Sequence, residues 1–280
     1  MGATITLRSI QKSASSFGAL FFVGLLITPA AGMAASAAPA VLKTEIGFSS
    51  MRFNYQEFAD TGGILDKEQG GIPGLTLRLG LRHADWEWET SGSYYQGQVP
   101  YAGQTNFGVP YNTRTDEKIG DIALRVGHWF GESHPVMPFA GIGYRRWDRS
   151  ILPGTLGGLF ESYRWKYAWV GSKFLAYQDS ASNFILDVGL LRPLHPEMRV
   201  DFRGSYNVEP VVNPVGKLGV RMLLTSNLAL SKSTGLSIEP YYEYWELGRS
   251  PTVTAGAVTV YEPASKTRNL GINLRLGWTL

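Results

Sequence analysis

The stretch SYRWKYAWV, residues 162–170, alternates aromatic residues with small or charged ones. Every second residue from 163 to 169 is tyrosine or tryptophan, and the residues between them are Arg164, Lys166 and Ala168. Side chains of a β-strand point alternately to its two faces, so this period of two predicts a strand with one aromatic and one polar face. We expect the aromatic face to be covered by protein or lipid, because four large rings on one face are unfavourable in water.

The same alternation recurs along the chain, separated by clusters of Gly, Pro, Asn, Asp and Ser, which favour turns. A further strand, 42–57, is less regular, because its apolar residues change phase between Phe48 and Met51; we expect a β-bulge there. With 162–170 this makes ten predicted strands, the others being 75–82, 86–91, 121–127, 140–145, 184–190, 217–224, 236–244 and 270–280.

The connections between these runs alternate in length. Short ones lie near 83–85, 131–135, 178–183 and 231–235, and long ones near 60–73, 96–114, 152–158, 193–215 and 248–266. Transmembrane barrels have short turns on one side of the membrane, long loops on the other, and strands of about 9–11 residues between them. We therefore predict an all-β fold, a transmembrane antiparallel up-and-down β-barrel of about ten strands.

Composition excludes several other classes. After residue 40 no stretch approaches the roughly 18 continuous apolar residues of a transmembrane helix. The chain has no cysteine, which excludes disulfides, thiolate metal sites and cysteine nucleophiles.

The N-terminal segment resembles a secretory signal. Arg8 and Lys12 precede an apolar run at 17–27, and small residues end in Ala35-Ser36-Ala37. We expect cleavage after Ala37, giving a signal peptide of residues 1–37 and a barrel domain of residues 38–280; a retained membrane anchor is the alternative. Removing the two basic residues leaves 24 basic against 23 acidic residues, so the net charge falls from +3 to +1. Nothing in this balance indicates nucleic acid as a partner.

Alternation alone does not say which face points inward. A soluble, lipocalin-like barrel has apolar residues inside, and an outer-membrane barrel has them outside. Aromatics near strand ends, at 86, 88, 129, 147, 163 and 278, favour a membrane girdle. On this interpretation the lipid-facing aromatics are Trp86, Trp88, Tyr144, Tyr163, Trp165, Tyr167, Trp169, Tyr242, Tyr244 and Trp278.

The opposite faces of the same strands carry acids and bases, which we expect to pair in the lumen. The predicted charge network contains Arg78, Arg82, Glu87, Glu89, Asp121, Arg125, Arg145, Arg164, Lys166, Asp187, Lys217, Arg221, Glu239, Glu243 and Arg275. Eight-stranded barrels are just filled by side chains, so a ten-stranded one is expected to be mostly plugged. Inward glycines, such as Gly143 and Gly271, leave room for a thin water path.

The chain resembles Gram-negative outer-membrane β-barrels in its export signal, its hairpin rhythm and a last strand that alternates up to the C-terminal residue, Leu280. Its size is shared with the ten-stranded omptin proteases and small surface antigens. The resemblance implies the cell outer membrane as location, outer-membrane lipids and lipopolysaccharide as partners, recognition of the C-terminal strand by the barrel assembly machinery, and a monomer.

Catalytic patterns are absent from the sequence. It contains neither the Asp-x-Asp nor the Asp-x-His of omptins, and no histidine is followed directly by serine. His195, with Glu197 nearby in a predicted external loop, is the nearest candidate for acid–base or metal chemistry. We therefore expect no enzymatic activity, catalytic residue, metal or cofactor. The leading hypothesis is a structural or surface-interaction protein; the alternatives are a narrow porin-like channel and, more distantly, an outer-membrane enzyme.

Overall fold

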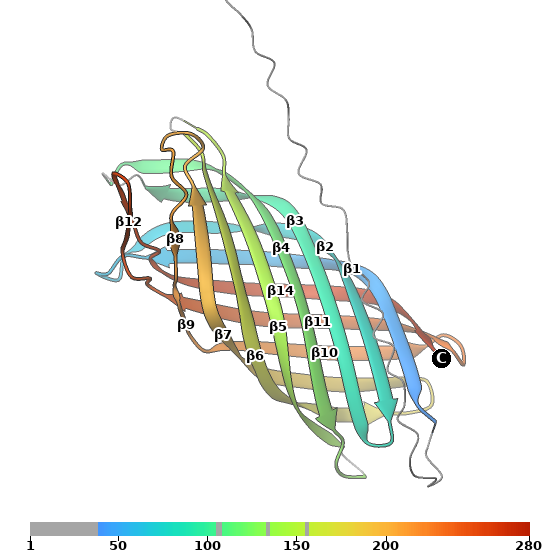
Figure 1. The fold of residues 1–280 in the computed structure, drawn as a ribbon. Coiled ribbons are helices and arrows are strands. Elements are labelled where there is room, and N and C mark those ends of the chain that lie inside the picture. The colour runs from blue at the N-terminus through green and yellow to red at the C-terminus, as the bar shows by residue number, and fades with distance from the viewer. Residues whose placement is uncertain (1–38, 105–107, 133–134, 155–156) are drawn as a thin grey trace, which may run out of the picture. The chain divides into compact units, whose positions relative to one another are not determined.

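The computed structural model describes residues 39–104, 108–132, 135–154 and 157–280. The predicted signal segment, 1–37, lies outside the described residues. None of the described residues forms a helix long and apolar enough to span a membrane. Within these ranges the chain is all-β (Figure 1), with strands β1 (Val41–Phe58), β2 (Ile64–His83), β3 (Trp86–Gln104), β4 (Pro110–His128), β5 (Val136–Ile151), β6 (Leu159–Gln178), β7 (Ser182–Asp201), β8 (Val211–Val212), β9 (Val215–Gly216), β10 (Gly219–Ala229), β11 (Thr234–Gly248), β12 (Val253–Ala255), β13 (Val258–Val260) and β14 (Ala264–Thr279).

Ten long antiparallel strands of the described chain form one closed sheet. Consecutive long strands pair with each other from β1 to β7, then β7 with β10, β10 with β11 and β11 with β14. Pairing of β14 with β1, from Lys43 opposite Thr279 to Phe58 opposite Ala264, closes the ring. The predicted ten-stranded antiparallel barrel is therefore confirmed.

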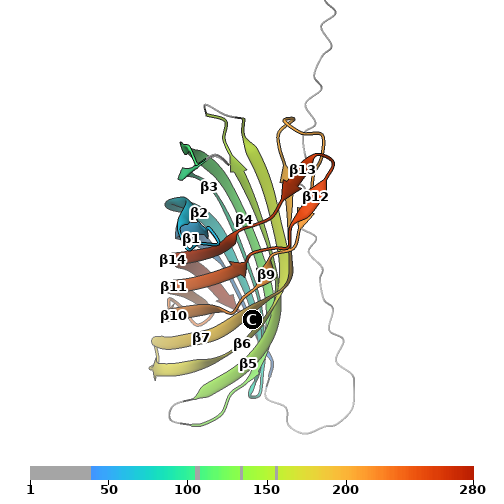
Figure 2. The same cartoon turned by 90° about the vertical axis from the view of Figure 1, so that its left-hand side faces the viewer.

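The strands are longer than predicted, with lengths up to 20 residues. Most of the stretches predicted as long connections at 60–73 and 96–114 belong to β2, β3 and β4, and β7 continues to Asp201. The loop that follows β7 contains β8 and β9, and the loop after β11 contains the β12–β13 hairpin, which lies at the far end of the barrel from the short turns (Figure 2).

The predicted β-bulge in the first strand is wrong. The pairing of β1 with β14 keeps one register from Lys43 to Phe58, and even-numbered residues point outward throughout. The apolar residues change phase because the surroundings change along the strand. Ile46 and Phe48 are exposed on the outside, whereas Met51, Phe53 and Tyr55 are buried inside.

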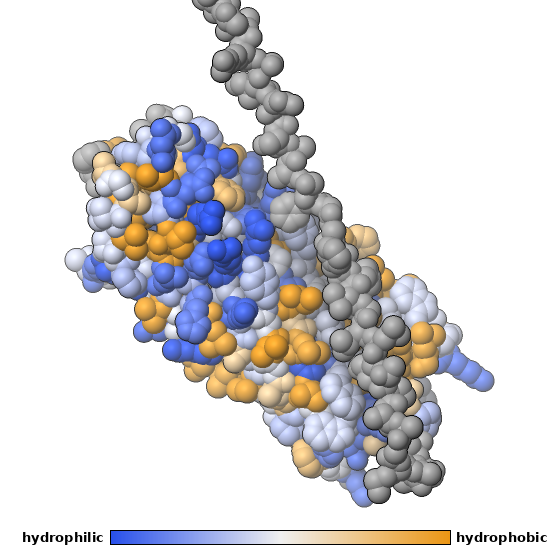
Figure 3. All heavy atoms as spheres, viewed as in Figure 1, coloured by the Kyte–Doolittle hydropathy of each residue, from blue (hydrophilic) through white to orange (hydrophobic). Residues whose placement is uncertain are grey.

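This switch divides the barrel into two regions. The belt half has apolar side chains outside and polar, charged and aromatic ones inside. The loop half has polar side chains outside and an apolar core that includes Phe53 and Trp147. Figure 3 shows hydrophobic residues over the middle of the barrel and hydrophilic ones towards the end that carries the long loops. The belt half comprises residues 41–49, 74–83, 86–95, 120–128, 136–145, 167–178, 182–192, 219–229, 234–245 and 269–279; the strand ends beyond them form the loop half.

The predicted orientation of 162–170 is wrong. Tyr163, Trp165, Tyr167 and Trp169 are buried inside the barrel, and Arg164 and Lys166 are exposed outside it. The predicted positions of Trp129 and Trp147 in an external girdle are also wrong, because both are buried. Residues 162–166 lie beyond the belt, where water replaces lipid at the outer surface, so aromatic side chains are more stable inside.

Candidate functional site

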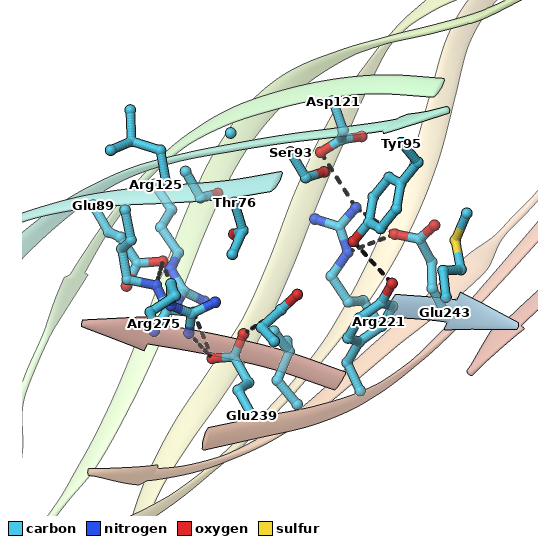
Figure 4. A pocket seen from close by; sticks show the side chains of 18 of the residues that line it. Thr76, Glu89, Ser93, Tyr95, Asp121, Arg125, Arg221, Glu239, Glu243 and Arg275 are labelled. Atoms are coloured by element: carbon cyan, nitrogen blue, oxygen red, sulfur yellow. Dashed lines mark hydrogen bonds and ion pairs between the residues drawn. The ribbon is translucent and has the colours of Figure 1, made fainter. Parts of the chain in front are cut away.

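The lumen of the belt half holds a continuous ion-pair network (Figure 4). On the side nearer the short turns, the Arg78 guanidinium lies 2.5 Å from Glu239 and 3.4 Å from Glu45. Arg275 also contacts both acids, at 2.8 Å from Glu239 and 3.3 Å from Glu45. The four side chains come from β1, β2, β11 and β14, so the network ties together strands on both sides of the β1–β14 closure.

Arg125 extends this network across the barrel. Its guanidinium donates to Asp187 on β7 and, at 2.8 Å, to Glu89 on β3. Lys173 on β6 lies 2.9 Å from the other Glu89 oxygen and 2.6 Å from Glu87. Glu89 pairs with both Arg125 and Lys173, and Asp187 and Glu87 each pair with one cation, so the charges are compensated despite burial.

A second group lies next to the first, nearer the loop half. Glu243 accepts from Arg145 at 2.9 Å and from Arg221 at 2.6 Å. Asp121 lies 3.5 Å from each of these arginines and accepts from the Tyr167 hydroxyl at 2.8 Å. Figure 4 shows Arg221 between Asp121 and Glu243.

The inward aromatic residues pack against these cations. The Arg125 guanidinium carbon lies 4.6 Å from the Trp169 ring centroid, and that of Arg221 lies 5.1 Å from it. Arg145 lies 5.2 Å from the Trp245 ring. Cation–π contacts of this kind stabilise buried guanidinium groups, which explains why aromatic residues share a face with charged ones inside the lumen.

The inward glycines do not provide a water path at the positions where aromatic rings lie over them. A Cβ at Gly143 would lie 2.2 Å from the Tyr167 ring, and one at Gly271 would lie 2.5 Å from the Tyr241 ring. The free volume among the charges in Figure 4 is about 70 Å³, enough for a few waters. At the short-turn end the lumen widens to about 350 Å³, lined by residues such as Lys43, Glu87 and Asn227.

The structure places most of the predicted charge network inside the lumen or at its short-turn mouth, where Arg82 is exposed beside Trp129. Three predicted members are wrong: Arg164, Lys166 and Lys217 are exposed on the outer surface. Sequence reasoning missed Lys173, which is buried with Glu87 and Glu89. Continuing the period of two from Trp169 through Gly171 would have found it, had the aromatic face been oriented inward.

The remaining predicted lipid-facing aromatics point outward. Trp86, Trp88, Tyr144 and Trp278 are exposed, and Tyr242 and Tyr244 are half-buried on the outer face of β11. They lie in the belt half, where apolar exposure is unfavourable unless the solvent is lipid.

A second buried cluster occupies the loop half. The Arg149 side chain is 1% exposed and contacts four carboxylates. Its guanidinium lies 2.8 Å from Glu57, 2.9 Å from Asp66, 2.8 Å from Glu68 and 2.7 Å from Glu161. Four ionised carboxylates would exceed the charge that one cation neutralises, so the cluster favours protonation of some of these acids.

Two further acids join this cluster. Glu262, from the loop after β13, accepts from the Tyr163 hydroxyl at 2.7 Å, and Glu117 accepts from the Trp147 indole. Burial, together with neighbouring carboxylates, raises the pKa of Glu57, Glu117 and Glu262 well above the usual range. These acids therefore hold protons at pH values where exposed glutamates are ionised.

His195 lies within β7 rather than in an external loop as predicted. Its backbone has φ of 48°, at a register shift between β6 and β7. In the described ranges, no group of three or more His, Asp or Glu residues is arranged to hold a metal ion.

Comparisons with known proteins address the fold. No family model and no curated protein matches the chain. Among solved structures, the outer membrane protease OmpT from Escherichia coli is similar over 88% of this chain and 99% of its own, with a TM-score of 0.59 and 10% sequence identity. The fold is that of an outer-membrane β-barrel. The translocator domain of the autotransporter NalP from Neisseria meningitidis is also similar, over 85% of this chain and 88% of its own, with a TM-score of 0.45 and 12% identity.

Proposed function

We propose that this chain is an integral outer-membrane protein with a plugged lumen, whose role is structural or surface-interacting. The observation that carries the proposal is the inverted polarity of the belt half. Ile46, Phe48 and Ile142 are exposed outside, whereas Glu45, Arg125 and Arg275 are buried inside. This arrangement is stable in a bilayer and unfavourable in water.

A plugged lumen follows from the number of cross-barrel contacts. Arg78, Arg125 and Arg221 each bind acids on non-adjacent strands, and the space left between them is about 70 Å³. A conducting path would require several of these ion pairs to separate, which is costly in a buried site. We therefore assign the proposed structural or surface-interacting role to the barrel wall and the external loops, without catalysis and without a cofactor.

The proposed partners follow from the same location. They are outer-membrane lipids and lipopolysaccharide around the belt, and the barrel assembly machinery, which would receive β14 at the C-terminal end. A monomer is the proposed oligomeric state, because the ten long strands close into a ring.

The first test combines outer-membrane fractionation with gel mobility of unboiled and boiled samples. A mobility shift in the outer-membrane fraction supports the proposal. Recovery in the soluble periplasmic fraction without a shift would overturn it.

Narrow conduction is a second candidate, favoured by the wider space of about 350 Å³ at the short-turn mouth. Planar-bilayer recordings distinguish the two. The plugged barrel predicts no resolved channels in the native protein and channels in an Arg125→Ala variant, because that change removes contacts to both Glu89 and Asp187. Steady conductance of the native protein, altered by Arg125→Ala, would instead favour the channel.

A further inference from the structure

A group of cations lies on the outer face of β4–β7, at the edge of the belt and directly beyond it. We call Lys118, Arg146, Arg164, Lys166 and Arg192 the cationic patch. Arg146 and Arg164 are about half exposed, and Lys118, Lys166 and Arg192 are also exposed. None of them takes part in the lumen network, so these charges face the medium outside the barrel.

The register brings like charges together within the patch. Arg146 on β5 lies directly opposite Arg164 on β6, and Lys166 lies opposite Tyr144, one outward position nearer the belt. Like charges directly opposite each other on neighbouring strands are destabilising. An anion bound between them would remove this cost.

Neighbouring acids compensate the patch in part. Asp148 pairs with Arg146 at 3.0 Å, and Glu197 pairs with Arg164. Across residues 39–104, 108–132, 135–154 and 157–280, no carboxylate forms an ion pair with Lys118, Lys166 or Arg192. Three of the five charges therefore remain available to an external anion.

The patch has the position and shape to receive a lipid headgroup. Tyr144, Leu190 and Leu194 are exposed apolar or aromatic residues on the same strands, so the patch borders the lipid-facing surface. An open groove of about 380 Å³ lies beside it, lined in part by Tyr144, Phe160, Ser162, Arg146 and Arg164, with Arg199, Asp201 and Glu209 completing the wall. Cations at this level interact with anionic headgroups, whereas acyl chains contact the belt.

We propose that the cationic patch binds a phosphate group of a phosphorylated glycolipid in the outer leaflet, with Lys166 donating to the phosphate and Arg146 and Arg164 adding positive charge beside it. Lys118 and Arg192 add charge on the neighbouring strands β4 and β7, and Tyr144 packs against the lipid. This inference rests on the proposed outer-membrane location and adds the side of the barrel and the residues that hold the lipid.

The test compares two triple variants with the same change of charge. R146Q/R164Q/K166Q removes the centre of the patch, and R52Q/K67Q/R268Q removes outward cations of β1, β2 and β14, away from β5 and β6 in the strand order. Each refolded protein is titrated in detergent with diphosphorylated lipid A, with dephosphorylated lipid A and with inorganic phosphate, and binding is read by native mass spectrometry.

The patch variant is expected to bind diphosphorylated lipid A about tenfold more weakly or worse, and the control variant about as tightly as the native protein. Equal losses in both variants, or no loss in either, would overturn the patch. Displacement of the lipid by equimolar inorganic phosphate would also overturn it, because the site would then select a free anion.

Gel mobility of unboiled samples separates the possible failures. If each variant keeps the heat-dependent shift but lipid binding is unchanged, this inference fails and the proposed function stands. If the native protein shows no shift and is soluble, the proposed function fails as well.

Discussion

In the continuous strand β1, apolar side chains point outward in the belt half and inward in the loop half. Near the short turns, Phe48 is 73% exposed outside while Glu45 is buried inside; further along, Arg52 points outward while Phe53 is buried. The backbone geometry is the same, so the solvent outside decides which side chains point inward. The belt half resembles a membrane protein and the loop half a water-soluble one, and each has its own way of burying charge.

The largest expected effect comes from removing the single cation of the loop-half cluster. Arg149→Met leaves Glu57, Asp66, Glu68 and Glu161 buried without their counterion, and should destabilise the loop half by about 3–5 kcal/mol. Limited proteolysis of the refolded protein should show cleavage in the loop half while the belt half stays protected.

Arg114→Met is the matched control, since Arg114 is exposed on the outer face of β4. The comparison between the halves would be contradicted if both variants behaved like the native protein, or if Arg149→Met prevented the belt half from forming.

The next effect tests the outer surface. Ile142, in the belt half of β5, is 65% exposed, and Ile142→Arg should cost about 2–4 kcal/mol in a bilayer because it places a charge against lipid. Asn112→Arg, on the exposed outer face of β4 in the loop half, should be nearly neutral. Urea unfolding in lipid vesicles measures both. Equal costs would indicate that both surfaces face the same solvent.

A smaller effect concerns the protons held in the loop half. Burial raises the pKa of Glu117 above its ordinary value of 4.5. At pH values between the ordinary pKa and the raised one, the folded protein therefore keeps a proton that the unfolded chain has released. Stability of the loop half should therefore fall as the pH rises above about 4.5. Glu117→Gln should flatten this dependence and stabilise the neutral-pH protein by on the order of 1 kcal/mol.

The measurement is the pH dependence of protease resistance between acidic and mildly alkaline conditions. Glu132→Gln, at an exposed position in the turn after β4, is the control and should leave the profile unchanged. A loop half that becomes more stable as the pH rises would contradict the assignment of these protons.

The smallest expected effect lies in the short turn between β6 and β7. The Tyr177 hydroxyl and the backbone N–H groups of Ala181 and Ser182 donate to Asp179 and lower its pKa to about 2. This contribution is present above the ordinary pKa of 3.8 and is lost as the pH falls towards 2. Asp179→Ala should loosen the turn, seen as faster amide exchange at residues 181 and 182, with the loop half unaffected.

The orientation of a strand was predicted correctly from sequence where one of its faces has the same surroundings along its whole length. In 270–280 the alternation from Leu270 to Trp278 predicts an outward apolar face, and these residues are exposed on β14. In the loop half the outer residues of β2, such as Lys67 and Gln69, are polar, and their inward neighbours Asp66 and Glu68 are acidic. Both faces of this part of β2 are polar, so the sequence predicted a loop where the structure has a strand.

The candidate site shows the same limit. The pairing of Arg125 with Asp187 joins residues 62 positions apart, and that of Arg275 with Glu45 joins residues 230 apart. Alternation predicted that these charges share the interior, but partner choice depends on strand order, register and tilt, which bring distant segments together.

The amino-acid sequence by itself determined the class of fold and the strand number, because a period of two and turn-forming residues act locally along the chain. Tertiary structure decided which face of each strand points inward, since a strand such as 162–170 is amphipathic either way. Tyr163 and Trp165 lie beyond the belt, and Tyr167 and Trp169 share their inward face and pack against Arg221 and Arg125 in the lumen. It also placed Arg149 among four acids and Arg146 opposite Arg164, because closure of the sheet sets which side chains meet.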